Sequence, residues 1–311
     1  MKVAIVGAGA MAGEHARAFA DVPGVTVAAF HSRTRARAEQ LAAQFPGARV
    51  CDSIAELYEK TRAELVVAAV SVLAMKPVAS ACFQFPWTVL LEKPPGLDFA
   101  EALLLQEEAQ RRGRRALVGL NRRFYSSTRL ALEGLRSRSG PRDVHVWDQQ
   151  DLERARFLGH PAAVVENWRY GNSIHLVDYL RVFGRGKVGA VEPVIPWDAA
   201  RPGRVVAKLV FESGDTGHYE AVWNQPGPWA VEVTAAETRW SMRPLEKLTC
   251  QEPGEAAPAA VETHAWDRDF KPGFRLQAEQ AVAAAHGAPS ESATLADAIE
   301  TMRLIAALYG G

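Results

Sequence analysis

The sequence predicts an α/β protein with two domains: a doubly wound parallel sheet, followed by an α+β domain on an open, mainly antiparallel sheet. Within the first 120 residues, short apolar runs alternate with amphipathic stretches, as in repeated βα units. Beyond residue 122 polar and apolar residues alternate, which is typical of a sheet with one solvated face. The length of 311 residues is also sufficient for two domains.

The first domain, expected at residues 1–121, should contain five strands. The predicted strands are Val3–Val6, Val25–Phe30, Leu65–Val70, Thr88–Leu91 and Ala116–Leu120. Helices are expected at Ala12–Ala20, in a second stretch that runs through Lys60 and in a third that ends near Gly113. The last two begin at capping boxes, in which a Ser or Asp is followed three residues later by Glu: Ser53 with Glu56, and Asp98 with Glu101.

The second domain, expected at residues 122–311, should supply strands at Asp143–Trp147, Arg204–Phe211, His218–Trp223 and Trp229–Thr234. Helices are predicted at Ser173–Phe183, Phe274–His286 and Leu295–Tyr309, and the last helix is allowed to pack back on the first domain. The apolar residues of two strands, Val222, Trp223, Val231 and Val233, would form an open sheet face if uncovered, which predicts a homo-oligomer, a dimer or a tetramer.

Composition excludes several classes of partner. The 36 basic and 36 acidic residues cancel, so no electrostatic attraction to nucleic acid or to a membrane surface is expected. The longest apolar run, Leu65–Met75, is much shorter than the roughly 20 residues that span a bilayer. Three separated cysteines fit no disulfide framework, and the histidines show no metal-ligand spacing. We therefore expect a cytoplasmic protein without a metal.

A glycine loop follows the first predicted strand. The segment from Gly7 through Ala12 reads G-x-G-x-x-A, with Gly9 in second place and Ala10 and Met11 between. In a βαβ unit this pattern lets a pyrophosphate approach the backbone at a helix N-terminus. It predicts a Rossmann domain that binds a dinucleotide, whereas the alternative is a plain tight turn.

The end of the second strand bears on the choice of cofactor. NAD-binding domains usually carry Asp or Glu there for the ribose hydroxyls. This chain instead has Ser32 and Arg33, with Arg37 nearby, which could hold a 2′-phosphate through charge-assisted hydrogen bonds. NADP(H) is therefore predicted, with NAD(H) less favoured; the alternative is a solvated basic start of a helix.

Two further segments are candidates for chemistry. Lys93, in Glu92-Lys93-Pro94, follows a strand at the sheet edge where open α/β proteins bind ligands, although such a tripeptide is also common in surface turns. His175 and Asp178 lie on one face of a predicted helix and could point into a cleft. A single histidine on so apolar a helix could equally be a core residue.

Taken in order, these motifs resemble the Gfo/Idh/MocA oxidoreductases, a family that includes inositol dehydrogenases and sugar-nucleotide dehydrogenases. The resemblance implies that His175 is the acid/base and that Lys93 contacts nicotinamide ribose and substrate. It also implies that Asn121 and Arg122, at the domain crossover, and Trp168-Arg169, before the His175 helix, lie around the cleft. Expected cofactor contacts are Gly7, Gly9, Ala10, Met11, Ser32, Arg33, Arg37, Ser71, Glu92, Lys93, Trp168 and Arg169; expected substrate contacts are Asn121, Arg122, Asn172 and Asp178.

The chain departs from the family pattern at two places. Gly171 stands where many members carry an acid four residues before the histidine, and Ser71 begins a segment that lacks the usual Pro-x-x-x-His. The expected activity is NADP-dependent hydride transfer to or from a carbinol or ketone of a sugar, cyclitol or nucleotide-linked sugar. The alternatives are a reductase of an imine or conjugated double bond, and a cofactor-sensing regulatory protein without turnover.

Overall fold

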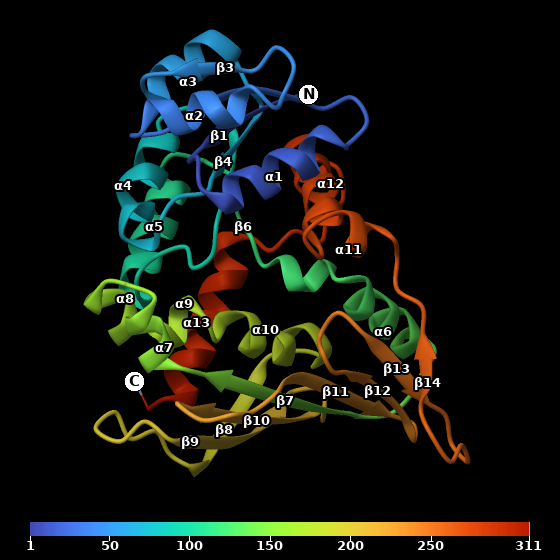
Figure 1. Ribbon diagram of the computed structural model, residues 1–311. Helices are drawn as coiled ribbons and strands as arrows, with labels where there is room; N and C mark the ends of the chain where they lie inside the picture. Colours follow the sequence, from blue (N-terminus) through green and yellow to red (C-terminus); the bar gives the residue numbers. More distant parts are fainter. Residues whose placement is uncertain (311) are drawn as a thin grey trace. The chain divides into compact units, whose positions relative to one another are not determined.

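Residues 1–310 are described by a computed structural model, and they form two compact units (Figure 1). The first unit comprises Met1–Asn121 and Arg268–Ile299. The second comprises Arg122–Asp267 and the chain from Glu300 onward. The crossover after Asn121 coincides with the expected boundary, but residues 268–299 depart from the expected second domain because they belong to the first unit.

Six parallel strands form the sheet of the first unit in the order β3-β2-β1-β4-β5-β6. Their bounds are Lys2–Val6 (β1), Thr26–His31 (β2), Arg49–Cys51 (β3), Leu65–Ala68 (β4), Thr88–Leu91 (β5) and Ala116–Val118 (β6). Every residue of β4 and β5 is buried, because helices cover both faces of the sheet. The predicted doubly wound parallel sheet is confirmed.

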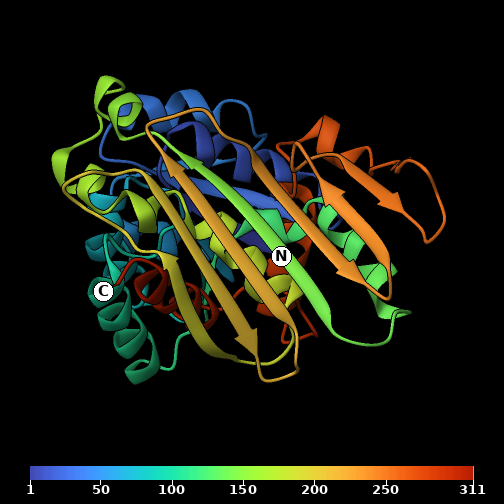
Figure 2. The ribbon, with the colours of Figure 1, turned by 90° about the horizontal axis from the view of Figure 1, so that it is seen from below.

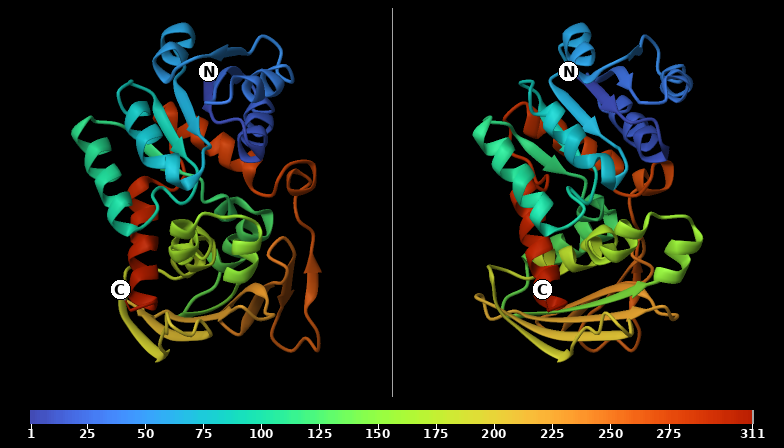
Figure 3. Two further views of the ribbon diagram at one scale, coloured as in Figure 1. Left: turned by 60° about the vertical axis from the view of Figure 1, so that its left-hand side comes forward. Right: turned by 90° about the vertical axis from the view of Figure 1, so that its left-hand side faces the viewer.

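Helices lie on both sides of this sheet (Figure 3). They are Ala10–Ala20 (α1), Arg35–Ala42 (α2), Ile54–Thr61 (α3), Val72–Cys82 (α4), Phe99–Arg111 (α5) and Phe274–Ala285 (α12). Both predicted N-caps form: the Ser53 hydroxyl accepts a hydrogen bond from Glu56 N at 3.0 Å, and the Asp98 carboxylate accepts one from Glu101 N at 2.8 Å. The helices α2 and α4 were not predicted.

Helix α12 packs against α1 and belongs, with residues 268–299, to the first unit. Its Phe274 and Ala281 are buried in the same apolar core as Ile5 and Phe19. The nearly buried guanidinium of Arg275 donates to Asp21 at 2.6 Å. We expected the last helix to pack back in this way, and the first unit also contains the start of that helix, Leu295–Leu308 (α13), as far as Ile299.

The second unit is built on an eight-stranded sheet with the order β14-β13-β12-β11-β7-β10-β9-β8. Its strands are Arg142–Gln150 (β7), Val188–Ile195 (β8), Arg204–Phe211 (β9), Thr216–Trp223 (β10), Trp229–Ala235 (β11), Thr238–Met242 (β12), Leu248–Gln251 (β13) and Ala259–Val261 (β14). All neighbouring pairs are antiparallel except β7 and β10. Figure 2 shows this broad sheet face-on. The predicted open, mainly antiparallel sheet is confirmed.

Short helices accompany this sheet, and α10 packs directly against β7. They are Ser126–Arg136 (α6), Leu152–Phe157 (α7), Ala162–Glu166 (α8), Trp168–Gly171 (α9) and Ile174–Phe183 (α10). The helices Trp266–Asp269 (α11) and Leu295–Leu308 (α13) each have residues in both units, because the first unit includes 268–299. Nearly every residue of α10 is buried, as its apolar sequence requires. In the described chain, 1–310, we find no helix with the length and apolar character needed to cross a membrane.

The residues expected to form an uncovered apolar sheet face are mostly buried, so that prediction is wrong. Trp223, Val231 and Val233 are buried within the second unit itself, and Val222 alone of the four lies on the opposite face. Strand alternation explains this, because successive side chains point to opposite faces and the apolar set faces the helices. The argument for oligomerisation from an uncovered apolar face therefore does not hold.

Candidate functional site

The glycine loop joins β1 to α1 and has the geometry of a phosphate cradle. Gly7 has a φ of +124°, and a Cβ at this position would lie 2.1 Å from the carbonyl oxygen of Ala69. Only glycine fits there. Gly9 is the N-cap of α1, and a Cβ there would meet no atom within 4 Å. The loop is therefore tight at its first glycine and open at its second, where a ligand can approach the backbone.

A cavity of about 430 Å³ lies beside this loop. It brings together residues predicted from three separate segments of the first unit: Gly7, Gly9, Ser32, Arg33, Arg37 and Ser71. The carboxyl ends of β1, β2 and β4 meet there, which is where open α/β sheets bind ligands. Ala10, Met11, Glu92 and Lys93 do not line this cavity.

The arginines after β2 differ in their partners. Arg35 is held by Glu39 and Asp52, two carboxylates on the surface. Within residues 1–310, Arg33 and Arg37 make no side-chain hydrogen bond or ion pair, and both line the cavity. Two guanidinium groups next to Ser32 thus face the cavity without a carboxylate to neutralise them.

The two glycines should respond differently to alanine. Gly9→Ala is expected to weaken nicotinamide cofactor binding by about tenfold or more, because the new methyl group fills the cradle. Its stability cost should be about 1 kcal/mol or less, since alanine is only a poorer N-cap. Gly7→Ala should instead destabilise the fold, since strained backbone alone costs about 1–3 kcal/mol. Fluorescence titration and thermal melts of both variants separate the two effects, and a stability loss in Gly9→Ala as large as that of Gly7→Ala would contradict this description.

Lys93 follows β5 and is preceded by a buried ion pair that the sequence did not predict. Glu92 accepts a hydrogen bond from Nε2 of the buried His15 at 2.8 Å, and its other oxygen accepts one from Lys93 N at 3.1 Å. Burial raises the pKa of the Glu92 carboxyl, but the hydrogen bond and charge of His15, together with Lys93, outweigh it and leave that pKa below its usual range. The carboxylate thus holds the backbone at Lys93. The direct contact of Glu92 with cofactor stays a prediction beside this positioning role.

His175 lies in the first turn of α10 and is mostly buried. Three residues later, Asp178 accepts two hydrogen bonds from the Arg123 guanidinium, at 2.6 and 2.7 Å. It also accepts one from Thr301 Oγ1 at 2.8 Å. Both carboxylate oxygens are therefore engaged within the second unit. The geometry gives Asp178 a structural role in fixing α10, and its contact with substrate stays a prediction.

A buried polar network lies beside His175 on the helix-covered face of the sheet. The side-chain oxygen of Gln150 accepts hydrogen bonds from Trp168 Nε1 at 2.9 Å and from Asn172 Nδ2 at 2.8 Å. Gln150 in turn donates to Asp148. Burial raises the pKa of Asp148. Gln150 thus fixes two predicted site residues. Its place four residues after Val146, on the same buried face of β7, was the sequence signal that could have found it.

The remaining predicted residues have identifiable neighbours. Asn121 donates to the carbonyl of Pro272 at 2.9 Å and so fixes the crossover in the first unit. In the second unit the Arg122 guanidinium lies 4.5 Å from the centre of the Trp229 ring. A Cβ at Gly171 would meet no atom within 4 Å, so packing does not require glycine where relatives carry an acid. Arg169 lies over the ring of Tyr170.

Comparison with known proteins agrees with this architecture. Residues 1–120 match the model of Gfo/Idh/MocA, an oxidoreductase family with an NAD-binding Rossmann fold. Inositol 2-dehydrogenase of Mycolicibacterium smegmatis is 33% identical over 126 residues, which are 40% of this chain and 36% of that protein. A dehydrogenase from Chromobacterium violaceum superposes with a TM-score of 0.83 at 20% identity, covering 98% of this chain and 93% of the other. UDP-N-acetylglucosamine 3-dehydrogenase from Acidithiobacillus ferrooxidans gives 0.78 at 17% identity, covering 100% and 97%.

The first unit is thus a dinucleotide-binding Rossmann domain of the oxidoreductase class. Residues 1–120 match the NAD-binding domain of the Gfo/Idh/MocA oxidoreductases, and the resemblance seen in the motifs is confirmed over this part of the chain. The matched region spans little more than a third of the inositol 2-dehydrogenase, 36% of its length. The two solved structures share the fold of this chain over nearly its whole length.

Proposed function

We propose that the protein is an NADP-dependent oxidoreductase that transfers hydride to or from a carbinol or ketone of a sugar, cyclitol or nucleotide-linked sugar. The observation that carries the cofactor assignment is the pair Arg33 and Arg37, which line the cavity beside Ser32 without a carboxylate partner. The substrate class rests on the inositol 2-dehydrogenases that match the first unit.

The residues of the cavity fit a nicotinamide dinucleotide. The open side of Gly9 and the N-terminus of α1 would hold the pyrophosphate through backbone amides. Ser32, Arg33 and Arg37 would bind the 2′-phosphate with charge-assisted hydrogen bonds. Hydride exchange with the substrate carbon is the chemistry that a bound nicotinamide supplies.

Two side chains carry the proton and charge chemistry in this proposal. In the oxidative direction an imidazole nitrogen of His175 takes the hydroxyl proton, and in reduction it returns that proton to the carbonyl oxygen. The Lys93 ammonium supplies positive charge that stabilises an alkoxide developing on the substrate. Glu92 holds the Lys93 backbone, whereas Gln150 fixes Trp168 and Asn172 beside the His175 helix.

The cofactor preference is tested by titrating NADPH and NADH against intrinsic tryptophan fluorescence. One hydrogen bond to a charged group contributes about 1.5–3 kcal/mol, so we expect NADPH to bind roughly ten- to a hundredfold more tightly. Arg33→Ala and Arg37→Ala should reduce that preference. The matched control is Arg35→Ala, which removes a neighbouring arginine that is already paired with Glu39 and Asp52. Equal or tighter binding of NADH would overturn the assignment.

Turnover assays distinguish the proposed carbinol or ketone oxidoreductase from the two alternative functions. Consumption of NADPH with keto-inositols and keto-sugars, or reduction of NADP with the corresponding alcohols, is the expected result. Reduction of imines or conjugated double bonds alone would favour the second enzyme class. Tight cofactor binding without turnover on any of these panels would support a regulatory protein that senses the cofactor.

A further inference from the structure

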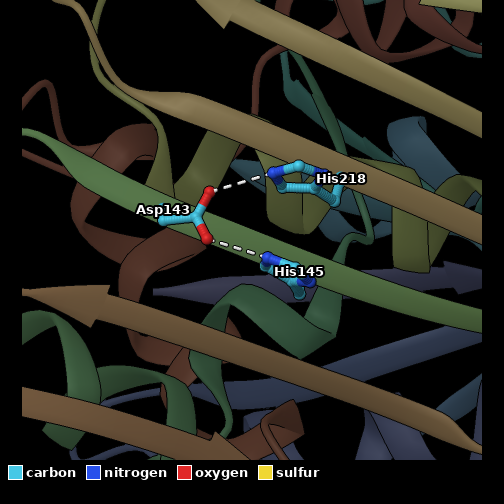
Figure 4. A group of neighbouring side chains, drawn as sticks. All are labelled: Asp143, His145 and His218. Atoms are coloured by element: carbon cyan, nitrogen blue, oxygen red, sulfur yellow. Dashed lines mark hydrogen bonds and ion pairs between the residues drawn. The ribbon is translucent and has the colours of Figure 1, made fainter.

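The outward face of the second unit carries a cluster of three metal-binding side chains. Asp143 and His145 lie on β7, and His218 lies on the adjacent strand β10 (Figure 4). These strands are parallel, and His218 is the direct register partner of His145. All three side chains alternate with buried residues, so they project from the face opposite to the helices.

The geometry of the cluster is close to that of a coordination sphere. His145 Nε2 lies 2.8 Å from one carboxylate oxygen of Asp143, and His218 Nε2 lies 3.2 Å from the other. One ligand atom from each residue can be chosen so that all three lie within 4.8 Å of one another. Ligand atoms around a tetrahedral ion with bonds of about 2.0–2.1 Å are separated by roughly 3.3 Å. The two distances from Asp143 to the imidazoles, 2.8 and 3.2 Å, are already close to this value.

The surroundings favour a cation with open coordination positions. Each of the three side chains is roughly 40% exposed, at 36% for His145, 41% for Asp143 and 37% for His218, so water can complete the sphere. Thr216 donates its hydroxyl to Asp143 and orients the carboxylate, as outer partners do in metal sites.

Neighbouring charges do not prevent occupation. Lys208 is the register partner of His218 on β9, and Glu232 is the partner of His145 on β11. The Glu232 carboxylate is paired with Arg239 at 3.4 Å, so the flanking residues contribute charges of both signs.

We propose that Asp143, His145 and His218 bind a divalent transition-metal ion, with Zn²⁺ as the natural candidate, which cross-links β7 to β10. Two imidazoles and one carboxylate suit zinc and its first-row neighbours, rather than the oxygen-only sites that calcium and magnesium prefer. The site is distinct from the cofactor cavity, which lies in the first unit. It also revises the expectation of no metal, which rested on sequence spacing alone.

The test is calorimetric titration of the untagged, chelator-treated chain with Zn²⁺, with Co²⁺ absorption as a second probe. We expect one ion per chain and a higher melting temperature when Zn²⁺ is bound. His145→Ala, His218→Ala and Asp143→Asn should each weaken binding by more than the roughly 10–100-fold that follows loss of an outer partner. The matched control is His286→Ala, which removes an exposed histidine at the end of α12.

The variants are suited to this test because the three side chains are partly exposed and their removal leaves the apolar core intact. Asp143→Asn keeps the size of the side chain, and melts of the metal-free variants check that each is folded. The proposal is wrong if the wild-type chain shows no saturable binding, or if the double variant of His145 and His218 binds Zn²⁺ as the wild type does.

Discussion

Replacing His175 by alanine is expected to lower turnover by about 10²–10⁴-fold, the usual cost of losing a general acid–base group. His175 lies in the first turn of α10 in the second unit, whereas the glycine loop and its cavity lie in the first. NADPH affinity should therefore remain nearly unchanged. The measurement is steady-state turnover on the identified substrate, together with a fluorescence titration of the cofactor.

Two further variants make this result interpretable. Because His175 is mostly buried, His175→Asn is included to preserve the packing of α10 while removing the proton-transfer group. His286→Ala, at an exposed histidine, should keep the wild-type rate. In the wild type, the pH–rate profile should show a limb that disappears in His175→Asn. If either His175 variant keeps most of the wild-type rate, another residue is the acid/base.

Breaking the buried pair of His15 and Glu92 should have the largest effect on stability. His15→Ala leaves the carboxylate of Glu92 buried without its neutralising partner, a change that typically costs about 3–5 kcal/mol. Adding Glu92→Gln in the same background should recover much of this loss, because the uncompensated charge is then absent. Urea denaturation of the wild type, the single variant and the double variant measures both free energies of unfolding.

The pH dependence of this effect has a defined sign. In the wild type the pKa of Glu92 is lowered, so its ion pair contributes stability above the pKa of the unfolded chain and loses it as the pH falls through the folded value. Without His15, burial dominates and should raise that pKa, so protonation at low pH relieves the penalty. The difference between wild type and His15→Ala should therefore shrink on acidification. A pH-independent difference, or one well below 1 kcal/mol, would contradict the role given to this pair.

The same pair connects stability to the site. Glu92 accepts a hydrogen bond from the backbone of Lys93, so its displacement in His15→Ala should also misplace the lysine. Turnover of that variant is expected to fall even under conditions where it is fully folded. Glu92→Gln alone, which keeps an acceptor for Lys93 N, should retain more activity than His15→Ala.

Much of the fold was determined locally and could be predicted. The strand Thr88–Leu91 has the predicted bounds because a mainly apolar run beside a polar turn is a local signal. The caps at Ser53 and Asp98 depend on a residue only three positions away. Gly7 is glycine because of its own φ and one close carbonyl, and the motif around it marks this in the sequence.

The sequence by itself therefore determined the doubly wound first domain, the open second sheet, the glycine loop and the candidates Lys93 and His175. Only the tertiary structure decided which polar residues are partners. Asp178 is bound by Arg123, 55 positions away, and His15 reaches Glu92 across 77. His145 lies beside His218 because β7 and β10 are adjacent in one sheet. The physical reason is that side-chain interactions depend on distance in space, and periodicity along a chain reports which face a residue occupies but not what lies opposite it.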